Sequence, residues 1–119
     1  MRVLLIEDDA LLRMVLSDRL AEEGIDVQGL ANAEDALILL GAGQVPDVLV
    51  TDIKLGGGLS GFDLAEVARA RHPEVGVILI SGASMSEVQH TLRRREHFLQ
   101  KPFEAEALAA AIRAAAARE

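Results

Sequence analysis

The sequence predicts an α/β domain with a doubly wound parallel sheet, because short apolar runs alternate with helical patterns along the whole chain. The run over residues 48–52 shows the strand type: it is short, almost wholly apolar and typical of a buried parallel strand. A length of 119 residues fits one domain, and 50% hydrophobic residues are enough for a sizeable core. We therefore expect a single domain that spans residues 1–119.

The first elements are a strand, a helix and a second strand. Residues 3–6 form the first apolar run, and leucines at four-residue spacing then mark the buried stripe of a helix, with Leu11 and Val15 beside them. Gly24 ends this helix because glycine tolerates a left-handed backbone. A short second strand is expected over residues 25–30. The leucines of the stripe are Leu12, Leu16 and Leu20.

The second helix is expected to begin after Asn32, whose side chain can cap the first turn. Asp35 then lies near the positive end of the helix dipole, which favours an acid there. Pro46 turns the chain into the third strand, residues 48–52. The apolar residues of this helix include Leu37 and Leu40.

The second half of the chain continues the alternation. A third helix is expected over residues 61–71 and is ended by Pro73, which disfavours a helical residue before it. A fourth strand follows over residues 76–81, a short helix over residues 86–95 and a fifth strand over residues 97–100.

The last helix is expected to open at Pro102 and Phe103. Leu108 and Ile112 face the sheet together with small alanines, and the run of alanines over residues 114–117 favours helix by propensity alone. The prediction is thus five strands and five helices.

The composition argues against several classes of function. No apolar run approaches the roughly 20 residues of a membrane span, and the N-terminus enters the first strand directly, so no membrane anchor or secretory signal is expected. The lack of cysteine excludes disulfide and thiol chemistry and is consistent with a reducing cytoplasm. Twelve basic and 19 acidic residues give a net charge of −7, which argues against non-specific binding to nucleic acid or anionic lipid.

One basic run interrupts this acidic chain. Arg93, Arg94 and Arg95 are expected at the end of the fourth helix. Arginine-rich helix surfaces are usually solvated, so an exposed surface is the simplest interpretation. The alternative is a binding site for an acidic partner.

Polar side chains end or directly follow four of the five predicted strands. Because the carboxyl ends of parallel strands meet at one edge, where open α/β sheets hold their chemistry, we expect these groups to lie together. Adjacent carboxylates repel each other unless a cation is present, and a few hard oxygen ligands suit Mg²⁺. The set therefore predicts a site for Mg²⁺ and a phosphoryl group. Its members are Glu7, Asp8, Asp52, Ser81 and Lys101.

In such a site, Asp52 would accept the phosphoryl group while Lys101 supplied a fixed positive charge and Ser81 a hydrogen bond. Phosphoryl transfer needs mostly this kind of positioning and electrostatic stabilisation. Each residue also has a purely structural interpretation: Asp52 as a solvated loop acid, the acids of residues 7–9 as a helix cap, and the other two as turn residues. Capping is the expected role for Asp9.

These segments resemble the receiver domain of two-component response regulators. They occur in the order found in that family and extend over almost the whole chain. The resemblance implies a flavodoxin-like (βα)5 fold with the strand order 2-1-3-4-5. The matching segments are VLLIEDD at residues 3–9, PDVLVTDIKL at residues 46–55, ILISG at residues 78–82 and LQKPF at residues 99–103.

The resemblance also implies a donor and a metal. Asp52 would take a phosphoryl group from the phosphohistidine of a sensor histidine kinase or of a histidine phosphotransfer protein. Glu7 and Asp8 would bind Mg²⁺ together with Asp52, and the backbone carbonyl of Lys54 would be a further ligand.

A switch is implied at the same edge. Lys101 would contact the phosphoryl group, and Ser81 would be the switch hydroxyl that moves toward it. Phe98 lies three residues before Lys101, where the family often has an aromatic switch residue. Its inward turn would change a protein-binding surface. The alternative for Phe98 is an ordinary core position.

The sequence departs from the family pattern in two places. Gly56, Gly57 and Gly58 stand where a proline is usual, and we expect a mobile loop that orders when Mg²⁺ or a partner binds. The segment from Ser81 to Lys101 is slightly short, so the fourth helix or its entry loop is expected to be trimmed.

The leading prediction is a cytoplasmic, non-enzymatic signalling domain whose changed surface is recognised by an unknown downstream protein. It would act without nucleic acid or membrane, as a monomer or as a dimer that forms on phosphorylation. The alternatives are a receiver that belongs to a hybrid kinase or longer regulator, and a degenerate receiver that acts by protein contact alone. A Mg²⁺-dependent phosphohydrolase is disfavoured, because Lys54 stands where a second acid would be needed.

Overall fold

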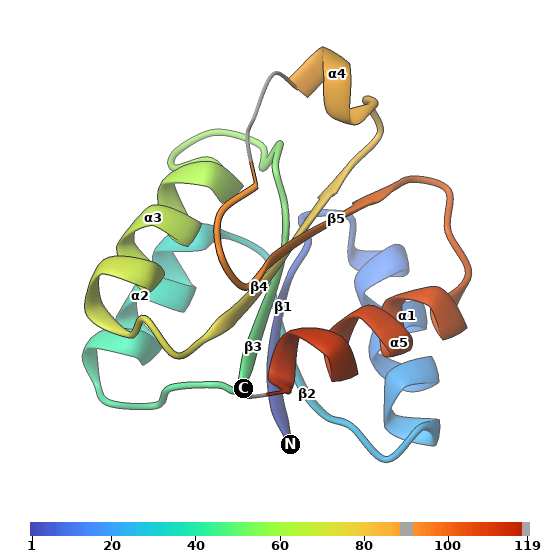
Figure 1. The fold of residues 1–119 in the computed structure, drawn as a ribbon, viewed down its shortest axis with the longest axis horizontal. Helices are drawn as coiled ribbons and strands as arrows, with labels where there is room; N and C mark the ends of the chain where they lie inside the picture. The colour runs from blue at the N-terminus through green and yellow to red at the C-terminus, as the bar shows by residue number, and fades with distance from the viewer. Residues whose placement is uncertain (89–91, 118–119) are drawn as a thin grey trace.

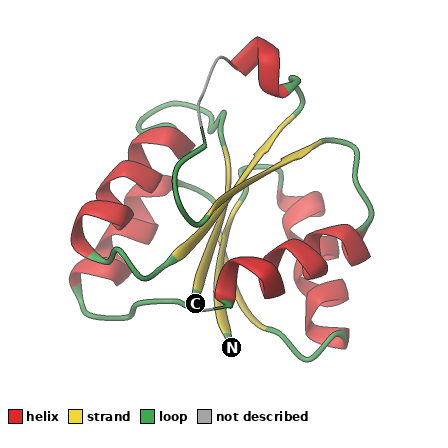
Figure 2. Ribbon diagram, viewed as in Figure 1, coloured by secondary structure: helices red, strands yellow, loops and turns green. Residues whose placement is uncertain are grey.

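A computed structural model describes residues 1–88 and 92–117 and shows a central parallel sheet covered by helices (Figures 1 and 2). The strands lie in the order β2-β1-β3-β4-β5, which confirms the predicted doubly wound sheet. The strands are β1 (Arg2–Ile6), β2 (Asp26–Leu30), β3 (Val48–Asp52), β4 (Gly76–Ser81) and β5 (Glu96–Gln100). The helices are α1 (Ala10–Glu22), α2 (Ala33–Gly41), α3 (Gly61–Arg71), α4 (Met85–Val88) and α5 (Ala105–Ala116).

The core consists of two layers, one on each face of the sheet. Helices α1 and α5 cover one face, while α2 and α3 cover the other (Figure 1). Successive residues of a strand point to opposite faces, so Val3 and Leu5 of β1 pack in the first layer and Leu4 and Ile6 in the second. This double burial explains why the strands are almost continuously apolar.

Local signals determine where the first two helices begin and end. The Asp9 carboxylate accepts hydrogen bonds from two backbone N–H groups of the first turn of α1, and the Asn32 side chain accepts one at the start of α2. Gly24 follows α1 with a φ of 80°, which a residue with a side chain rarely adopts. The predicted roles of all three residues are confirmed.

The predicted buried stripe of α1 is only partly correct. Leu16 and Leu20 are buried, but Leu11 is 66% exposed and Val15 is 43% exposed. Each helical residue is rotated by about 100° from its neighbour, so the positions just before the stripe turn away from the sheet. The prediction for Leu11 and Val15 is therefore wrong.

Two further helix boundaries differ from the prediction. The fourth helix is described over Met85–Val88, residues 89–91 of the predicted helix lie outside the described residues, and residues 92–95 form an irregular turn before β5. The last helix begins at Ala105, because Glu104 has an extended backbone with a ψ of 146°. Arg93 to Arg95 are therefore not helical, and Pro102 and Phe103 belong to the loop before α5.

The described helices contain no segment long and apolar enough to cross a membrane.

Gly61 is required at the start of α3, where the helix meets the backbone of β3. A Cβ atom at this position would overlap the carbonyl oxygen of Asp52. The Gly61 N–H also donates a hydrogen bond to the carbonyl of Ile53 at 2.9 Å, so the helix cannot move away without losing that bond.

Gly61→Ala is therefore expected to lower the free energy of unfolding by about 2–3 kcal/mol, the upper range for overpacking. Urea unfolding at equilibrium measures the change. Gly41→Ala is the matched control, because a Cβ atom on this last residue of α2 would meet nothing within 4 Å. The control should be neutral or slightly stabilising. Equal stabilities of the two variants would show that the space around Gly61 is not limiting.

Candidate functional site

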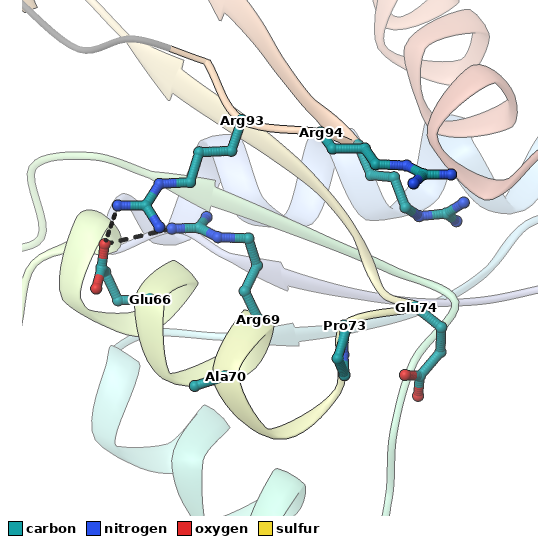
Figure 3. A pocket seen from close by; sticks show the side chains of 8 residues that line it. Glu66, Arg69, Ala70, Pro73, Glu74, Arg93 and Arg94 are labelled. Atoms are coloured by element: carbon teal, nitrogen blue, oxygen red, sulfur yellow. Dashed lines mark hydrogen bonds and ion pairs between the residues drawn. The ribbon is translucent and has the colours of Figure 1, made fainter.

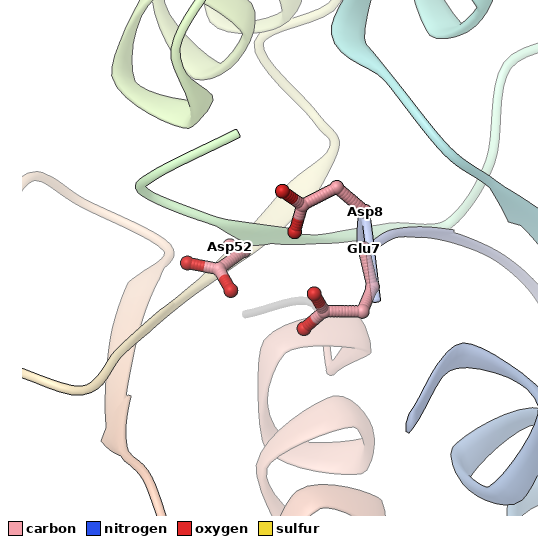
Figure 4. A group of neighbouring side chains, drawn as sticks. All are labelled: Glu7, Asp8 and Asp52. Carbon is pink, nitrogen blue, oxygen red and sulfur yellow. The ribbon is translucent and has the colours of Figure 1, made fainter. Parts of the chain in front are cut away.

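Three carboxylates lie together at the carboxyl edge of the sheet. Glu7 and Asp8 directly follow β1, and Asp52 ends the neighbouring strand β3, in a register that pairs Ile6 with Thr51. One ligand atom from each of the three acids lies within 4.8 Å of the others, and the three side chains converge in Figure 4. The carboxyl edge of the sheet, where the sequence predicts the site, therefore contains all three predicted acids.

Lys101 lies against two of these acids. Its Nζ is 2.9 Å from Glu7 Oε1 and 2.5 Å from Asp52 Oδ2. Glu7 is 2% exposed and Asp52 is 6% exposed, whereas Asp8 is exposed to solvent. Burying charged groups is costly unless they are paired, so the lysine compensates the two carboxylates that water reaches least.

The crowding changes how readily these groups ionise. Burial raises the pKa of Glu7, although hydrogen bonds from the Asp9 N–H and from Lys101 partly oppose the rise. A side-chain hydrogen bond with Glu7 is the main cause that lowers the pKa of Asp8. Burial opposes the charge of Lys101, but its hydrogen bonds to Asp52 and Glu7 outweigh burial and raise the pKa of the ammonium. Burial therefore favours the protonated form of Glu7, whereas hydrogen bonding favours the charged form of Asp8.

Ser81 reaches the same region from β4. It is buried, and its Oγ accepts a hydrogen bond from the Ala83 N–H at 3.0 Å. The Lys101 N–H donates to the Ser81 carbonyl at 2.7 Å, which joins the ends of β4 and β5. Ser81 and Asp52 both line a cavity of about 530 Å³. A group that enters this cavity would therefore meet both Asp52 and Ser81.

The glycine loop, residues 53–60 between β3 and α3, is held by hydrogen bonds to carboxylates. The Gly56 N–H donates to Asp8 Oδ2 at 3.1 Å, and the Leu59 N–H donates to Glu34 Oε2 at 2.9 Å. The second hydrogen bond lowers the pKa of Glu34. Gly57 and Gly58 have φ values of 68° and 70°, so this path of the loop depends on glycine. That the loop becomes ordered on binding Mg²⁺ or a partner stays a prediction.

Two contacts of the site were not predicted from the sequence. Glu34 reaches the glycine loop from the start of α2, and Arg13 Nη1 in α1 donates to the carbonyl of Glu7 at 2.7 Å. Neither has a local signal, because an acid in the first turn of a helix and an arginine on a helix surface are common features of any sequence.

Lys54 adjoins the acids, whereas Phe98 lies in the apolar core beside β4. The Lys54 N–H donates to Asp52 Oδ1 at 3.1 Å, while its side chain is exposed. Phe98 on β5 is half-buried and packs in an apolar cluster on the α3 side of the sheet, with Leu79 and Val77 among its members. Metal binding by the Lys54 carbonyl and the switch role of Phe98 stay predictions.

The chain matches one protein family over most of its length. The family model "Response regulator receiver domain" matches residues 3–113. The response regulator protein FleR of Pseudomonas aeruginosa is 36% identical over 109 residues, which cover 90% of this chain and 23% of FleR. This chain thus spans less than a quarter of the length of that relative.

Solved structures agree with this match. The crystal structure of a response regulator receiver protein from Sinorhizobium medicae superposes with a TM-score of 0.90 at 28% identity, covering 98% of this chain and 94% of that one. The receiver domain of the hybrid histidine kinase CckA superposes with a TM-score of 0.82 at 27% identity, covering 98% of this chain and all of the other.

Proposed function

Because the chain belongs to the response regulator receiver family, we propose that it is a phospho-accepting domain in which Asp52 takes a phosphoryl group. The donor would be the phosphohistidine of a sensor histidine kinase or of a histidine phosphotransfer protein. The observation that carries the proposal is the contact of Lys101 Nζ with Asp52, with the other two acids within 4.8 Å. A nearly buried carboxylate beside a fixed cation and a cation-binding acid pair is suited to phosphoryl transfer.

The acidic cluster fits a small divalent cation. Each of the three carboxylates offers an oxygen within 4.8 Å of the other two, and a few hard oxygen ligands suit Mg²⁺. Glu7, Asp8 and Asp52, with the backbone carbonyl of Lys54, would hold the ion. When bound, Mg²⁺ would neutralise charge on the carboxylates and on the phosphoryl oxygens.

The residues of the chain would divide the remaining work. An oxygen of Asp52 forms a bond to phosphorus while the phosphorus–nitrogen bond of the donor histidine breaks, and the imidazole leaves with the electron pair of that bond. Lys101 then holds a phosphoryl oxygen in place of the carboxylate oxygen that it contacts now. Ser81 Oγ, which lines the same cavity, donates a hydrogen bond to a phosphoryl oxygen. Movement of Ser81 would allow Phe98 to turn inward.

Phosphorylation is tested by mass spectrometry of the intact protein after incubation with Mg²⁺ and acetyl phosphate. We expect a gain of one phosphoryl group that is lost in Asp52→Asn. Asp26→Asn is the matched control, because Asp26 is an exposed acid at the start of β2 and should not affect the gain. An unchanged mass of the wild type with competent donors would instead favour a degenerate receiver that acts by protein contact.

Mg²⁺ affinity is expected to fall as the pH is lowered from about 7 to about 5. Glu7 must lose its proton to bind the ion, and burial raises its pKa above the ordinary value of 4.5. Protonation therefore begins to compete at a higher pH than for an exposed glutamate. Isothermal titration calorimetry measures the affinity, and Glu7→Gln should bind weakly with a flatter pH dependence. A wild-type affinity that is constant over this range would contradict the assignment of Glu7.

We further propose that residues 1–119 form one receiver domain that works in the cytoplasm and has no separate substrate. Its output would be a surface recognised by another protein, either as a monomer or as a dimer formed on phosphorylation. The net charge of −7 supports an output that does not involve direct contact of this domain with nucleic acid or membrane. A DNA-binding output, if the domain belongs to a longer regulator, would lie outside these residues.

A further inference from the structure

A second hollow lies beside the amino ends of β4 and β5, at the opposite end of the strands from Asp52. It has a volume of about 740 Å³ and is bounded by the second half of α3, the connection into β4 and the turn before β5 (Figure 3). Strand β4 has six residues and runs from this end of the sheet to the phosphoryl edge, a distance of about 20 Å. We call this hollow the arginine groove, after Arg69, Arg93, Arg94 and Arg95 in its lining.

The arginine groove reverses the charge of the molecule locally. Four of the 12 basic residues of the chain line it, against only two acids, Glu66 and Glu74. The protein as a whole carries a net charge of −7. A concentration of positive charge on an acidic domain favours an anionic ligand at this place rather than over the whole surface.

Two of the guanidinium groups are held in position by glutamates. The Glu96 side chain at the start of β5 is fully buried; it pairs with Arg69 and accepts a hydrogen bond from the Arg93 N–H at 2.9 Å. Glu66 Oε1 lies 3.0 Å from Arg93 Nη2 and 3.4 Å from Arg69 Nη2. Figure 3 draws both contacts as dashed lines. A ligand therefore meets guanidinium groups that are already ordered, which reduces the entropy lost on binding.

Arg95 fixes the turn before β5 against the end of α5. Arg95 has a φ of 65° and is the only non-glycine residue with positive φ in the part of the chain that the structure describes. Its guanidinium donates to the carbonyls of Ala115 and Ala117 at the end of α5, at 2.9 and 3.2 Å. This anchor holds the turn in place, and Arg94 is exposed on it at the groove.

We propose that the arginine groove docks an acidic segment of a partner protein. Carboxylates of the segment pair with Arg93 and Arg94, since guanidinium groups bind carboxylates through paired hydrogen bonds. Ala70 and Pro73 offer an apolar wall to a neighbouring side chain of the segment. Docking at this distance leaves Asp52 open to its phosphodonor, so the inference goes beyond the proposed phosphorylation.

An acidic protein segment fits better than a nucleic acid. Nucleic acids bring an unbroken row of phosphates and are held by many adjacent cations. Glu66 and Glu74 interrupt the groove and would repel such a row. In an extended peptide, successive side chains point in opposite directions, so its acidic side chains can be directed away from these two glutamates.

The test uses a short fluorescein-labelled peptide of alternating glutamate and leucine and measures binding by fluorescence anisotropy. We expect binding that weakens with salt and that Arg94→Glu reduces by about tenfold or more, the effect of one charge-assisted hydrogen bond. Arg71→Glu is the matched control. It changes the net charge equally on an exposed residue of α3 that does not line the groove, and binding should stay within about twofold.

NMR of the unaltered protein gives a second measurement that does not depend on a variant. The peptide should shift the amide signals of Arg69 and of residues 93–95, and leave those of Asp8 and Asp52 unchanged. No binding, shifts at other places, or equal losses in Arg94→Glu and Arg71→Glu would overturn the proposal. So would equally tight binding of an oligonucleotide of the same charge, or of inorganic phosphate at the same site.

Discussion

Lys101→Met is expected to slow phosphorylation of Asp52 by about 10²–10³-fold, the loss seen when one positioned donor to a developing charge is removed. The lysine ammonium lies 2.5 Å from the Asp52 carboxylate and is the one cation that contacts it among the described residues. Without it, a phosphoryl oxygen would face two acids with no fixed positive charge. The measurement is the initial rate of mass gain with acetyl phosphate and Mg²⁺.

The chain offers a matched control for this variant, because its only other lysine is Lys54. The Lys54 side chain is exposed two residues after Asp52, and only its backbone N–H is bonded to the carboxylate. Lys54→Met should therefore change the rate by no more than a few fold. Comparable rates for Lys101→Met and the wild type would remove the physical basis of the proposed function.

The same substitution should also reveal the repulsion between the buried acids. Lys101→Met leaves Glu7 and Asp52 without their shared cation, so the free energy of unfolding should fall without Mg²⁺. The pKa of Glu7 is already raised in the folded protein. Because the pKa of Glu7 is higher in the folded than in the unfolded protein, protonated Glu7 contributes stability at low pH. This contribution is lost as the pH rises through the pKa of the folded state. The variant should thus be less impaired at about pH 5 than at about pH 8.

Arg69→Met is expected to lower the free energy of unfolding by about 3–5 kcal/mol, which is a large fraction of the stability of a small domain. Arg69 on α3 pairs with Glu96, whose side chain is fully buried at the start of β5. Removing the guanidinium takes away the cation that pairs with this interior carboxylate, although the Arg93 N–H still donates a hydrogen bond to it. Equilibrium urea unfolding measures the loss.

Two further variants show whether the buried charge of Glu96 is the cause. Arg71→Met removes an exposed arginine two residues along the same helix and should change stability by less than about 0.5 kcal/mol. The double variant Arg69→Met with Glu96→Leu removes the charge as well as its partner and should recover much of the loss. If the double variant is no more stable than Arg69→Met alone, the packing of Arg69 rather than its charge is responsible.

Several features of the site could be predicted because they depend on short-range patterns. Asp52 is found at the end of an apolar run, and the carboxyl ends of parallel strands must meet at one edge. Asp9 and Asn32 cap their helices through hydrogen bonds to residues two or three positions away. In each case the partners are close in sequence, or the geometry of a parallel sheet brings them together.

Other features depend on contacts that no local pattern contains. The predicted helix through Arg93 to Arg95 is wrong, because Arg95 instead reaches the carbonyls that end α5 and the Arg93 N–H bonds to Glu96. Helix propensity is a weak preference that such tertiary contacts override. The hydrogen bond of Glu34 to the glycine loop likewise joins residues 25 positions apart.

The amino-acid sequence by itself determined the alternation of strands and helices, the family resemblance and the acids at the carboxyl edge of the sheet. These follow from the two periodicities of the backbone and from the rule that parallel strands share one direction. Only the tertiary structure decided that Lys101 contacts both Glu7 and Asp52, and that arginines from two distant segments form one groove. Those arrangements are set by side chains that find their charge partners across the fold, because an ionised group that leaves water must be paired.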